Sequence, residues 1–110
     1  MGPKSDILPG TLYMLILRSL ARMGPMHGYG IAQFIQQRSD DVLQVEEGSL
    51  YPALHRMEQS GWVASSWGLT ATNRKAKYYK LTAVGRKQLR AAEADFEHLV
   101  RGVRAILHYA

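Results

Sequence analysis

The sequence predicts a mainly helical protein with one small β-hairpin, in the order of three short helices, the hairpin and a long last helix. Three observations predict it. Apolar residues recur at helical spacing in four segments, and capping or stop residues bound those segments. Two β-type runs lie between residues 62 and 81, and an apolar heptad repeat runs from residue 89 to 106. A chain of 110 residues is enough for one compact unit.

The first helix is expected over Thr11–Met23 and ends at Gly24-Pro25, because glycine suits the left-handed cap and proline cannot continue the helix. Its apolar stripe comprises Leu12, Leu15, Ile16, Leu20 and Met23. The tetrapeptide HGYG at residues 27–30 is expected to form a turn. It leads into a second helix over Gly30–Arg38, whose buried residues are Ile31, Phe34 and Ile35.

The third helix is expected to begin near Ser49, whose hydroxyl can accept hydrogen bonds from the free N–H groups of the first turn. Pro52 is tolerated in a first turn, and Gly61 marks the end of the helix. Leu50, Leu54 and Met57 then line one face. The outward face carries Tyr51, His55 and Arg56, where a plain solvated helix more often carries Glu and Lys.

The hairpin is expected to consist of Trp62–Trp67 and Ala76–Leu81, joined by a long polar tip. Tyr78 and Tyr79 point to opposite faces of their strand, and Tyr79 is expected in the core. Both tryptophans, Trp62 and Trp67, are expected to pack in the core or against the hairpin. Stacking on an aromatic effector is the alternative for them.

The last helix is expected to start after the N-cap Thr82 and to run toward Leu107, with Gly85 as a mild weakness in its first turn. Two sets of apolar residues repeat every seven positions and make a seam of nearly three heptads. The seam must be buried, on the first helix of the same chain, on a second copy, or on both, and we expect both. The expected dimer interface comprises Leu12, Leu15, Leu89, Ala92, Phe96, Leu99, Val103 and Ile106.

The charge is unevenly distributed along the chain. The net charge is +5, and none of the nine acidic residues lies between Gln59 and Ala92, whereas seven of the fourteen basic residues do. Such a segregated cluster is the usual footprint of a polyanion site, although a solvated, solubilising face is the alternative. The chain has no cysteine, which excludes disulfides, thiolate metal sites and cysteine catalysis.

No feature of the sequence indicates an enzyme. It has no nucleophile elbow, no phosphate-cradling glycine loop and no paired-carboxylate site, and no three residues have metal-ligand spacing. We therefore expect no cofactor and no metal. The N-terminal residues 1–10 do not resemble a secretory signal, and the apolar run Leu12–Leu20 is interrupted by Arg18 and too short to span a bilayer. We expect a cytoplasmic protein that does not bind membranes.

The order of the elements describes a winged helix–turn–helix over residues 1–81, followed by a dimerisation helix over residues 82–110. In that arrangement the third helix enters the major groove of DNA and the hairpin lies along the backbone. Tyr51, His55 and Arg56 would then face the groove, and Ser49 and Tyr51 would suit phosphate contact at the helix N-terminus. Arg74, Lys75 and Lys77 would neutralise phosphates from the hairpin. A winged-helix module that binds another protein is the alternative.

Four segments also resemble one known family. LPGTLYMLILRSL, HGYGI, VEEGSLYPALHRMEQSGW and RKAKYYKLTAVGRKQL are similar to the PadR-like transcriptional regulators, specifically to the short members with one C-terminal helix. The resemblance implies a homodimeric DNA-binding protein, usually a repressor, that reads a pseudo-palindromic site in double-stranded DNA. It also implies that Tyr29, Ser49, Tyr51, Pro52 and Arg56 lie at or near the DNA. Some members release DNA when a small aromatic compound binds near the dimer interface, so the resemblance adds an aromatic effector as a candidate partner.

Overall fold

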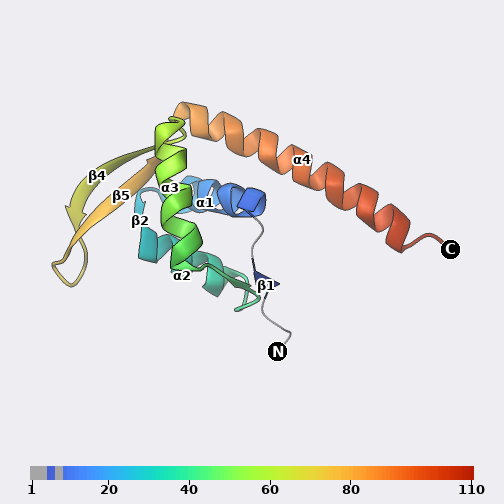
Figure 1. Ribbon diagram of the computed structural model, residues 1–110, viewed down its shortest axis with the longest axis horizontal. Helices are drawn as coiled ribbons and strands as arrows, with labels where there is room; N and C mark the ends of the chain where they lie inside the picture. The colour runs from blue at the N-terminus through green and yellow to red at the C-terminus, as the bar shows by residue number, and fades with distance from the viewer. Residues whose placement is uncertain (1–4, 7–8) are drawn as a thin grey trace.

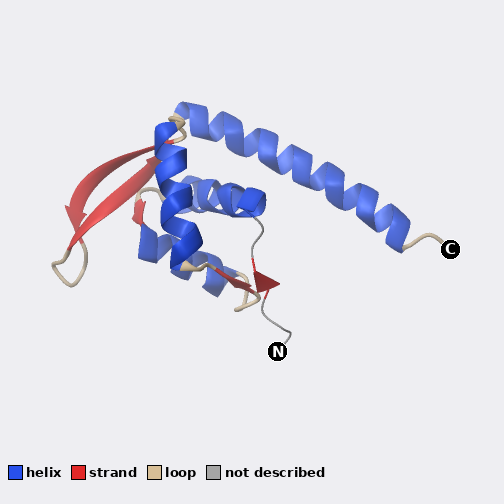
Figure 2. Cartoon of the chain, viewed as in Figure 1, coloured by secondary structure: helices blue, strands red, loops and turns tan. Residues whose placement is uncertain are grey.

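The computed structural model describes residues 5–6 and 9–110, and it confirms the mainly helical fold with a small β-sheet (Figures 1 and 2). The start of the expected domain, residues 1–4 and 7–8, lies outside the described residues. The helices are α1 (Pro9–Met23), α2 (Gly28–Arg38), α3 (Glu47–Gln59) and α4 (Ala83–Leu107). The strands are β1 (Ser5–Asp6), β2 (Met26–His27), β3 (Leu43–Gln44), β4 (Val63–Leu69) and β5 (Lys75–Leu81).

Helices α1 to α3 form the body of the molecule, with α3 lying across α1, as Figure 1 shows. The hairpin β4–β5, with its tip, extends from one side of this body, and we call residues 63–81 the wing. Helix α4 leaves from the other side and carries the C-terminus away from the body (Figure 1). The molecule is therefore elongated, with extents of 57 × 34 × 22 Å.

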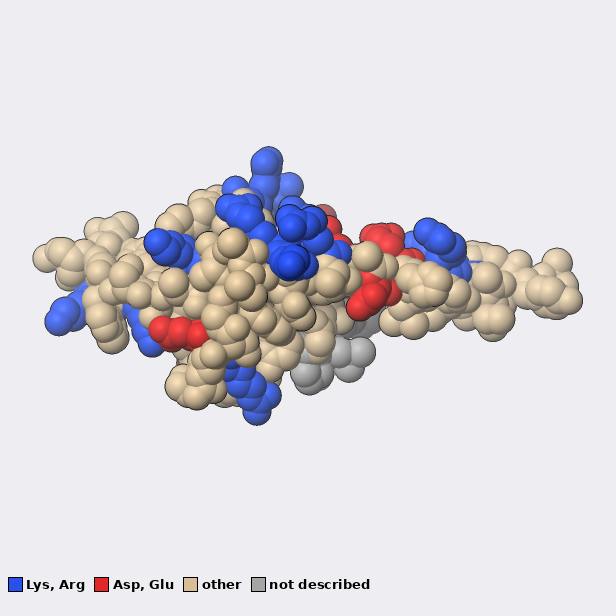
Figure 3. All heavy atoms as spheres, turned by 90° about the horizontal axis from the view of Figure 1, so that it is seen from above, with Lys and Arg blue, Asp and Glu red and all other residues tan. Residues whose placement is uncertain are grey.

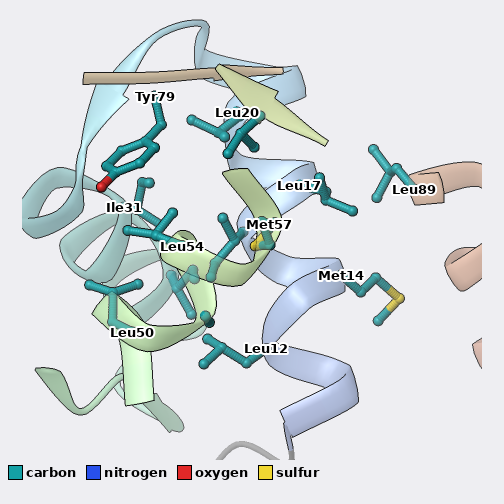
Figure 4. Packing of buried hydrophobic residues seen from close by; sticks show 14 residues of the cluster. Leu12, Met14, Leu17, Leu20, Ile31, Leu50, Leu54, Met57, Tyr79 and Leu89 are labelled. Carbon is teal, nitrogen blue, oxygen red and sulfur yellow. The ribbon is translucent and has the colours of Figure 1, made fainter. Parts of the chain in front are cut away.

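The core forms where α1, α2, α3 and the base of the wing meet (Figure 4). Ile16, Ile31 and Leu54 have no exposed surface. The other buried apolar residues are Leu12, Met14, Leu17, Leu20, Ile35, Leu50, Ala53, Met57, Val63, Tyr79 and Leu89. The predicted core positions Tyr79 and Met57 are confirmed, whereas Met23 at the end of α1 is exposed.

The sheet has a third strand that the sequence pattern does not reveal. Strand β2 pairs antiparallel with β5, placing Met26 opposite Tyr79 and His27 opposite Tyr78. Immediately after it, α2 begins at Gly28, and the Nδ1 atom of His27 caps the helix by accepting a hydrogen bond from the Gly30 N–H at 3.1 Å. The prediction of a turn at residues 27–30 is therefore wrong. Strand β2, which pairs with the distant strand β5, ends at His27, and α2 starts at the next residue.

Helix α3 starts two residues earlier than predicted. Glu46 occupies the N-cap position without a side-chain capping bond, so the prediction that Ser49 is the cap is wrong. Pro52 consequently lies in the second turn and leaves the Gly48 carbonyl without its usual i+4 donor. The predicted end is confirmed: Gly61 has φ of +77° and the Trp62 N–H donates to the Met57 carbonyl at 2.9 Å, which is the Schellman motif.

The wing is longer, and its tip shorter, than the sequence predicts. Both strands have seven residues and pair from Val63–Leu81 to Leu69–Lys75, so the tip spans residues 70–74. Asn73 has φ of 63° in the tip, a conformation that asparagine tolerates better than most residues. The sequence predicts the polar segment GLTATNRK as the tip. The backbone pairing of β4 to β5 continues into this segment as far as Leu69 and Lys75, so its polar character hid the end of β4.

Helix α4 begins as predicted at Thr82, whose Oγ1 accepts a hydrogen bond from the Gly85 N–H at 3.0 Å. Gly85, however, is not a weakness. A Cβ atom built there would lie 2.1 Å from the Trp62 carbonyl oxygen and 2.8 Å from Cδ1 of Leu81. Only glycine allows the first turn of α4 to approach the end of α3 this closely.

Only the first part of α4 packs on its own chain. Leu89 is buried and Ala92 half-buried against α1, but Leu99 and Ile106 are 62% and 77% exposed. Of the residues expected at a dimer interface, Leu12 and Leu89 belong instead to the core of the single chain. Within residues 5–6 and 9–110, no helix is both long and apolar enough to cross a membrane.

We expect Gly85→Ala to lower the free energy of unfolding by about 1–3 kcal/mol, because the added methyl group would overlap the Trp62 carbonyl. The matched control is Gly102→Ala in the same helix, where nothing lies within 4 Å of the new Cβ. Alanine there should stabilise the helix by up to about 1 kcal/mol. Urea unfolding at one fixed protein concentration measures both changes, and equal midpoints for the two variants would contradict the close approach.

Candidate nucleic-acid interface

The inner face of α3 fixes which of its side chains face outward. Leu50, Leu54 and Met57 are buried against the body. With 3.6 residues per turn, the opposite side carries Gly48, Pro52, His55 and Gln59, flanked by Tyr51 and Arg56. All six of these outward residues are exposed. The structure thus brings the predicted residues of the third helix onto one open surface, and Gln59, the last residue of α3, lies on the same outer side, as the helical spacing predicts.

Tyr51 is held at one flank of this surface by the start of α2. A Cβ atom on Gly28 would lie 2.7 Å from the ring atom Cε1 of Tyr51, so the tyrosine ring rests directly on the glycine backbone. About half of Tyr51 stays exposed. Tyr29 from α2 is also exposed, and both tyrosines line one open groove. The sequence could not reveal this contact, because it joins residues from two separate helices.

Arg56 lies on the other flank, toward α1. Its Nη1 atom donates to the hydroxyl of Tyr13 at 3.3 Å, and with Ser49 and Pro52 it borders a small open pocket of about 210 Å³. Arg56 is exposed, and its guanidinium has five N–H donors in total. It can therefore bind a base edge or a phosphate while Tyr13 orients it.

A larger groove of about 930 Å³ separates the N-terminus of α2, the outer side of α3 and the wing. The predicted residues Tyr29, Tyr51, Arg74, Lys75 and Lys77 all line it. Four further polar residues, which the sequence did not indicate as site residues, also line the groove: His27, Gln33, Thr70 and Thr72. Tyr51, at one flank of the outward surface of α3, and the cationic wing therefore border one concave surface, whereas Arg56 lies on the other flank of α3.

Lys77 has a partner within the chain. Its ammonium lies 3.0 Å from Oε1 of Glu58 on α3, and the other oxygen of Glu58 accepts a hydrogen bond from the Ser65 hydroxyl on β4. The Ser65 and Lys77 hydrogen bonds hold the pKa of Glu58 below the ordinary glutamate value, and the bond to Glu58 raises the pKa of Lys77. Lys77 therefore ties the wing to α3, and Arg74 and Lys75 are the exposed cations near the tip.

Lys and Arg are concentrated over the middle of the molecule, where α4 begins, and further basic residues lie toward the wing (Figure 3). Acidic residues occur farther along α4, where Glu93 pairs with Arg18 of α1, and one acidic group lies toward the wing; the distal end of α4 is mostly uncharged (Figure 3). On this face the basic side chains thus gather over the start of α4, and the apolar end of α4 lies beyond them.

The two tryptophans differ in their environments. Trp62 is half-buried and packs edge-on against Tyr13, with ring centroids 6.0 Å apart, as expected for a packing residue. Trp67 is 68% exposed and lines the groove of about 930 Å³. The prediction that Trp67 packs against the hairpin is therefore wrong, since the outer half of the wing has no element beneath it.

The family comparison agrees with this geometry. The sequence model of the transcriptional regulator PadR-like family matches residues 16–91, which run from the second half of α1 to the first turns of α4. A protein of Lysinibacillus sphaericus, known only as uncharacterized, is 33% identical over 86 residues, and the match covers 78% of each chain.

Solved structures have the same fold. A PadR family transcriptional regulator from Eggerthella lenta superposes with a TM-score of 0.76 at 34% identity, covering 92% of this chain and 85% of the other. A PadR family transcription regulator from Clostridium difficile superposes with a TM-score of 0.74 at 26% identity, covering 87% of this chain and 97% of the other.

The Glu58–Lys77 pair predicts a pH dependence. Because the folded-state pKa of Glu58 is lowered, its contribution to stability is present above the unfolded value of about 4.3 and is lost as pH falls through the folded value. The contribution to stability of Lys77, whose pKa is raised, is lost as pH rises above about 10.4.

In Glu58→Gln the loss of stability at acid pH should be smaller than in the unmodified protein. Melting temperatures from pH 3 to pH 7 measure it, with Glu97→Gln on the exposed face of α4 as the control. Identical acid profiles for Glu58→Gln and the unmodified protein would contradict the pair.

Proposed function

The chain belongs to the PadR-like family of transcriptional regulators, whose members bind DNA, and on that premise we propose that it is a homodimeric repressor that reads a pseudo-palindromic operator. One observation carries the proposal: Tyr51, at the flank of the exposed outward face of α3, borders the same groove as Arg74, Lys75 and Lys77 of the wing. Regulators of this family are not enzymes. We further propose that the protein acts in the cytoplasm, where its partner DNA is found in bacterial relatives.

In the proposed complex, α3 enters the major groove with His55, Gln59 and Arg56 toward base edges. Arginine can donate two hydrogen bonds to guanine, and glutamine can pair with adenine in the same way. Ser49, Tyr51, Pro52 and Tyr29 approach the flanking backbone, because they lie at the N-terminal end of α3 or beside it. The short outward residues Gly48 and Pro52 let the helix approach closely.

The wing contributes phosphate contacts through Arg74 and Lys75, which are exposed near its tip. Lys77 has a smaller share in this proposal than the sequence suggests, because Glu58 already compensates its charge. Each phosphate contact adds to the salt dependence of binding and little to sequence preference.

The distal face of α4 supports pairing with a second copy. Phe96, Leu99, Val103 and Ile106 are exposed on one seam, at 39%, 62%, 46% and 77%. Ala92 and Leu15 are partly buried against the core of the chain, and we include them in the proposed interface. A contiguous apolar face of this kind is a mark of a protein–protein contact, and a two-fold pair of such helices would set two α3 helices on successive turns of DNA.

A groove of about 410 Å³ between α1 and α4 is where we propose that a small aromatic effector binds. Met14, Phe96 and Leu99 line it and supply an apolar wall, and it lies beside the proposed dimer seam. An effector bound there would alter the angle between α4 and the body, and so the separation of the two recognition helices.

Selecting bound duplexes from a random DNA library tests the proposed reading function. An enriched sequence with two-fold symmetry would support a dimer that reads half-sites about 34–36 Å apart. A winged-helix module that binds another protein predicts no enriched sequence. A transcription assay with the selected site placed over a promoter then distinguishes repression from activation.

Arg56→Ala and Lys75→Ala should weaken DNA binding in different ways. Arg56→Ala should cost about 1–3 kcal/mol and relax preference at one base position of each half-site. Lys75→Ala should weaken binding to all sequences alike and lower the slope of log affinity against log salt by about 1. Titrations of specific and scrambled duplexes at several salt concentrations measure both effects. A Lys75→Ala slope equal to that of the unmodified protein would remove the wing from the proposed interface.

Leu99→Asp should dissociate the proposed homodimer, because it places a carboxylate in the centre of the exposed apolar seam of α4. Ala94→Asp adds the same carboxylate on the opposite, exposed side of the helix and should leave the dimer intact. Sedimentation measures the mass of each variant. A monomeric unmodified protein, or a Leu99→Asp variant of unchanged mass, would rule out pairing through this seam.

A further inference from the structure

Two large apolar side chains stand open to solvent on the outer half of the wing. Trp67 is 68% and Leu69 is 63% exposed, and both belong to β4. They are two residues apart, so they lie on the same face of the sheet. Clustered exposed apolar side chains on a small protein mark a contact surface.

The same face of the wing is cationic. Leu69 lies opposite Lys75 in the antiparallel register and Arg74 follows in the tip, whereas Lys77, opposite Trp67, is compensated by Glu58. The sequence has no acidic residue from Gln59 to Ala92. A partner of this face must therefore offer apolar surface and negative charge side by side, as the sugar–phosphate walls of a nucleic-acid groove do.

The far face of the wing holds its backbone in place. The ring of Tyr78 lies against Gly68, where a Cβ would be 3.0 Å from Cδ1, and the Tyr78 hydroxyl donates to the Leu69 carbonyl at 3.0 Å. These contacts of Tyr78 hold the backbone of β4 in place next to Trp67, whose side chain lies on the opposite face of the sheet.

The reach of the wing fits the groove next to the one proposed for α3. From Val63, at about 3.3 Å per residue, β4 extends roughly 13 Å to Trp67 and roughly 20 Å to its end at Leu69. Half a turn of B-DNA, the offset from a major groove to the neighbouring minor groove, is about 17 Å. Trp67 also lines the same concave surface as Tyr29 and Tyr51, so one duplex can meet all three.

We propose that Trp67 is a minor-groove wedge. When α3 occupies the major groove, the indole enters the adjacent minor groove and packs on deoxyribose and base edges at one base step, while Arg74 and Lys75 bind the phosphates on either side. This inference rests on the proposed DNA binding and adds to it a second reading site. The wedge makes affinity depend on base pairs that α3 never touches, through the width and the amino groups of the minor groove.

Fluorescence tests the location of the indole. The chain has two tryptophans, so Trp62→Phe leaves Trp67 as the one indole emitter. On titration with the duplex selected from the random library, the emission of Trp67 should shift to the blue and lose intensity as the indole leaves water. Unchanged emission at saturating specific DNA would overturn the wedge and leave the proposed function standing.

Binding measurements separate the wedge from a phosphate contact. Trp67→Ala should lower affinity by roughly ten- to a hundredfold, as expected for loss of one aromatic contact to DNA, without changing the salt slope. Trp67→Phe should recover part of the loss. Val84→Ala removes a side chain that is also exposed, at the start of α4, and should bind as tightly as the unmodified protein.

Inosine identifies the groove. Inosine–cytosine pairs present the major-groove edge of guanine–cytosine but lack the amino group in the minor groove. Replacing guanine by inosine in the base pairs flanking each half-site should tighten binding by the unmodified protein and not by Trp67→Ala. Equal responses of the two proteins would overturn the inference.

The remaining outcomes are also decisive. An emission shift that grows with protein concentration in the absence of DNA would assign the apolar face to a second copy of the chain and overturn the wedge. A failure of the unmodified protein to select any sequence would refute the proposed function, and the wedge with it.

Discussion

Burial of one side of α3 is the constraint on which the rest of this structure depends. Leu50, Leu54 and Met57 pack into the core formed with α1 and α2, and Tyr79 brings the base of the wing to the same core. Once these side chains are buried, helical geometry leaves Pro52, His55 and Gln59 no orientation except outward. A hydrophobic contact that touches no DNA thus orients the surface that we propose reads the operator.

The ends of α3 transmit that orientation to its neighbours. The Schellman motif at Gly61 turns the chain directly into β4, and Glu58 binds Ser65 on β4 and Lys77 on β5. Thr82 and Gly85 bring the first turn of α4 against the Trp62 carbonyl just beyond the same helix end. Wing and long helix therefore both start from one short region, and a shift of α3 would move both.

The molecule buries its apolar surface unevenly. The body is well packed, but the distal seam of α4 and the outer wing keep large apolar side chains in water. These two regions lie at opposite ends of an elongated molecule, as Figure 1 shows. The seam of α4 is apolar and suits the proposed pairing with a copy of the same helix, whereas the outer wing lies beside Arg74 and Lys75 and suits a polyanion. Their separation would let the proposed pairing and DNA reading occupy different surfaces.

The sequence by itself determined the order of the helices and the hairpin, most of the buried positions of α1 to α3, the cap at Thr82, the stop at Gly61 and the membership of a family, because these depend on local periodicity and on short motifs. It also identified the outward residues of α3. Only the tertiary structure decided the strand at Met26–His27, the true start of α3, the need for glycine at positions 28 and 85, the partner of Lys77 and the exposure of Trp67. Each of these depends on contacts between residues that are distant in the chain, and no local pattern encodes which distant atoms will meet or where the packing ends.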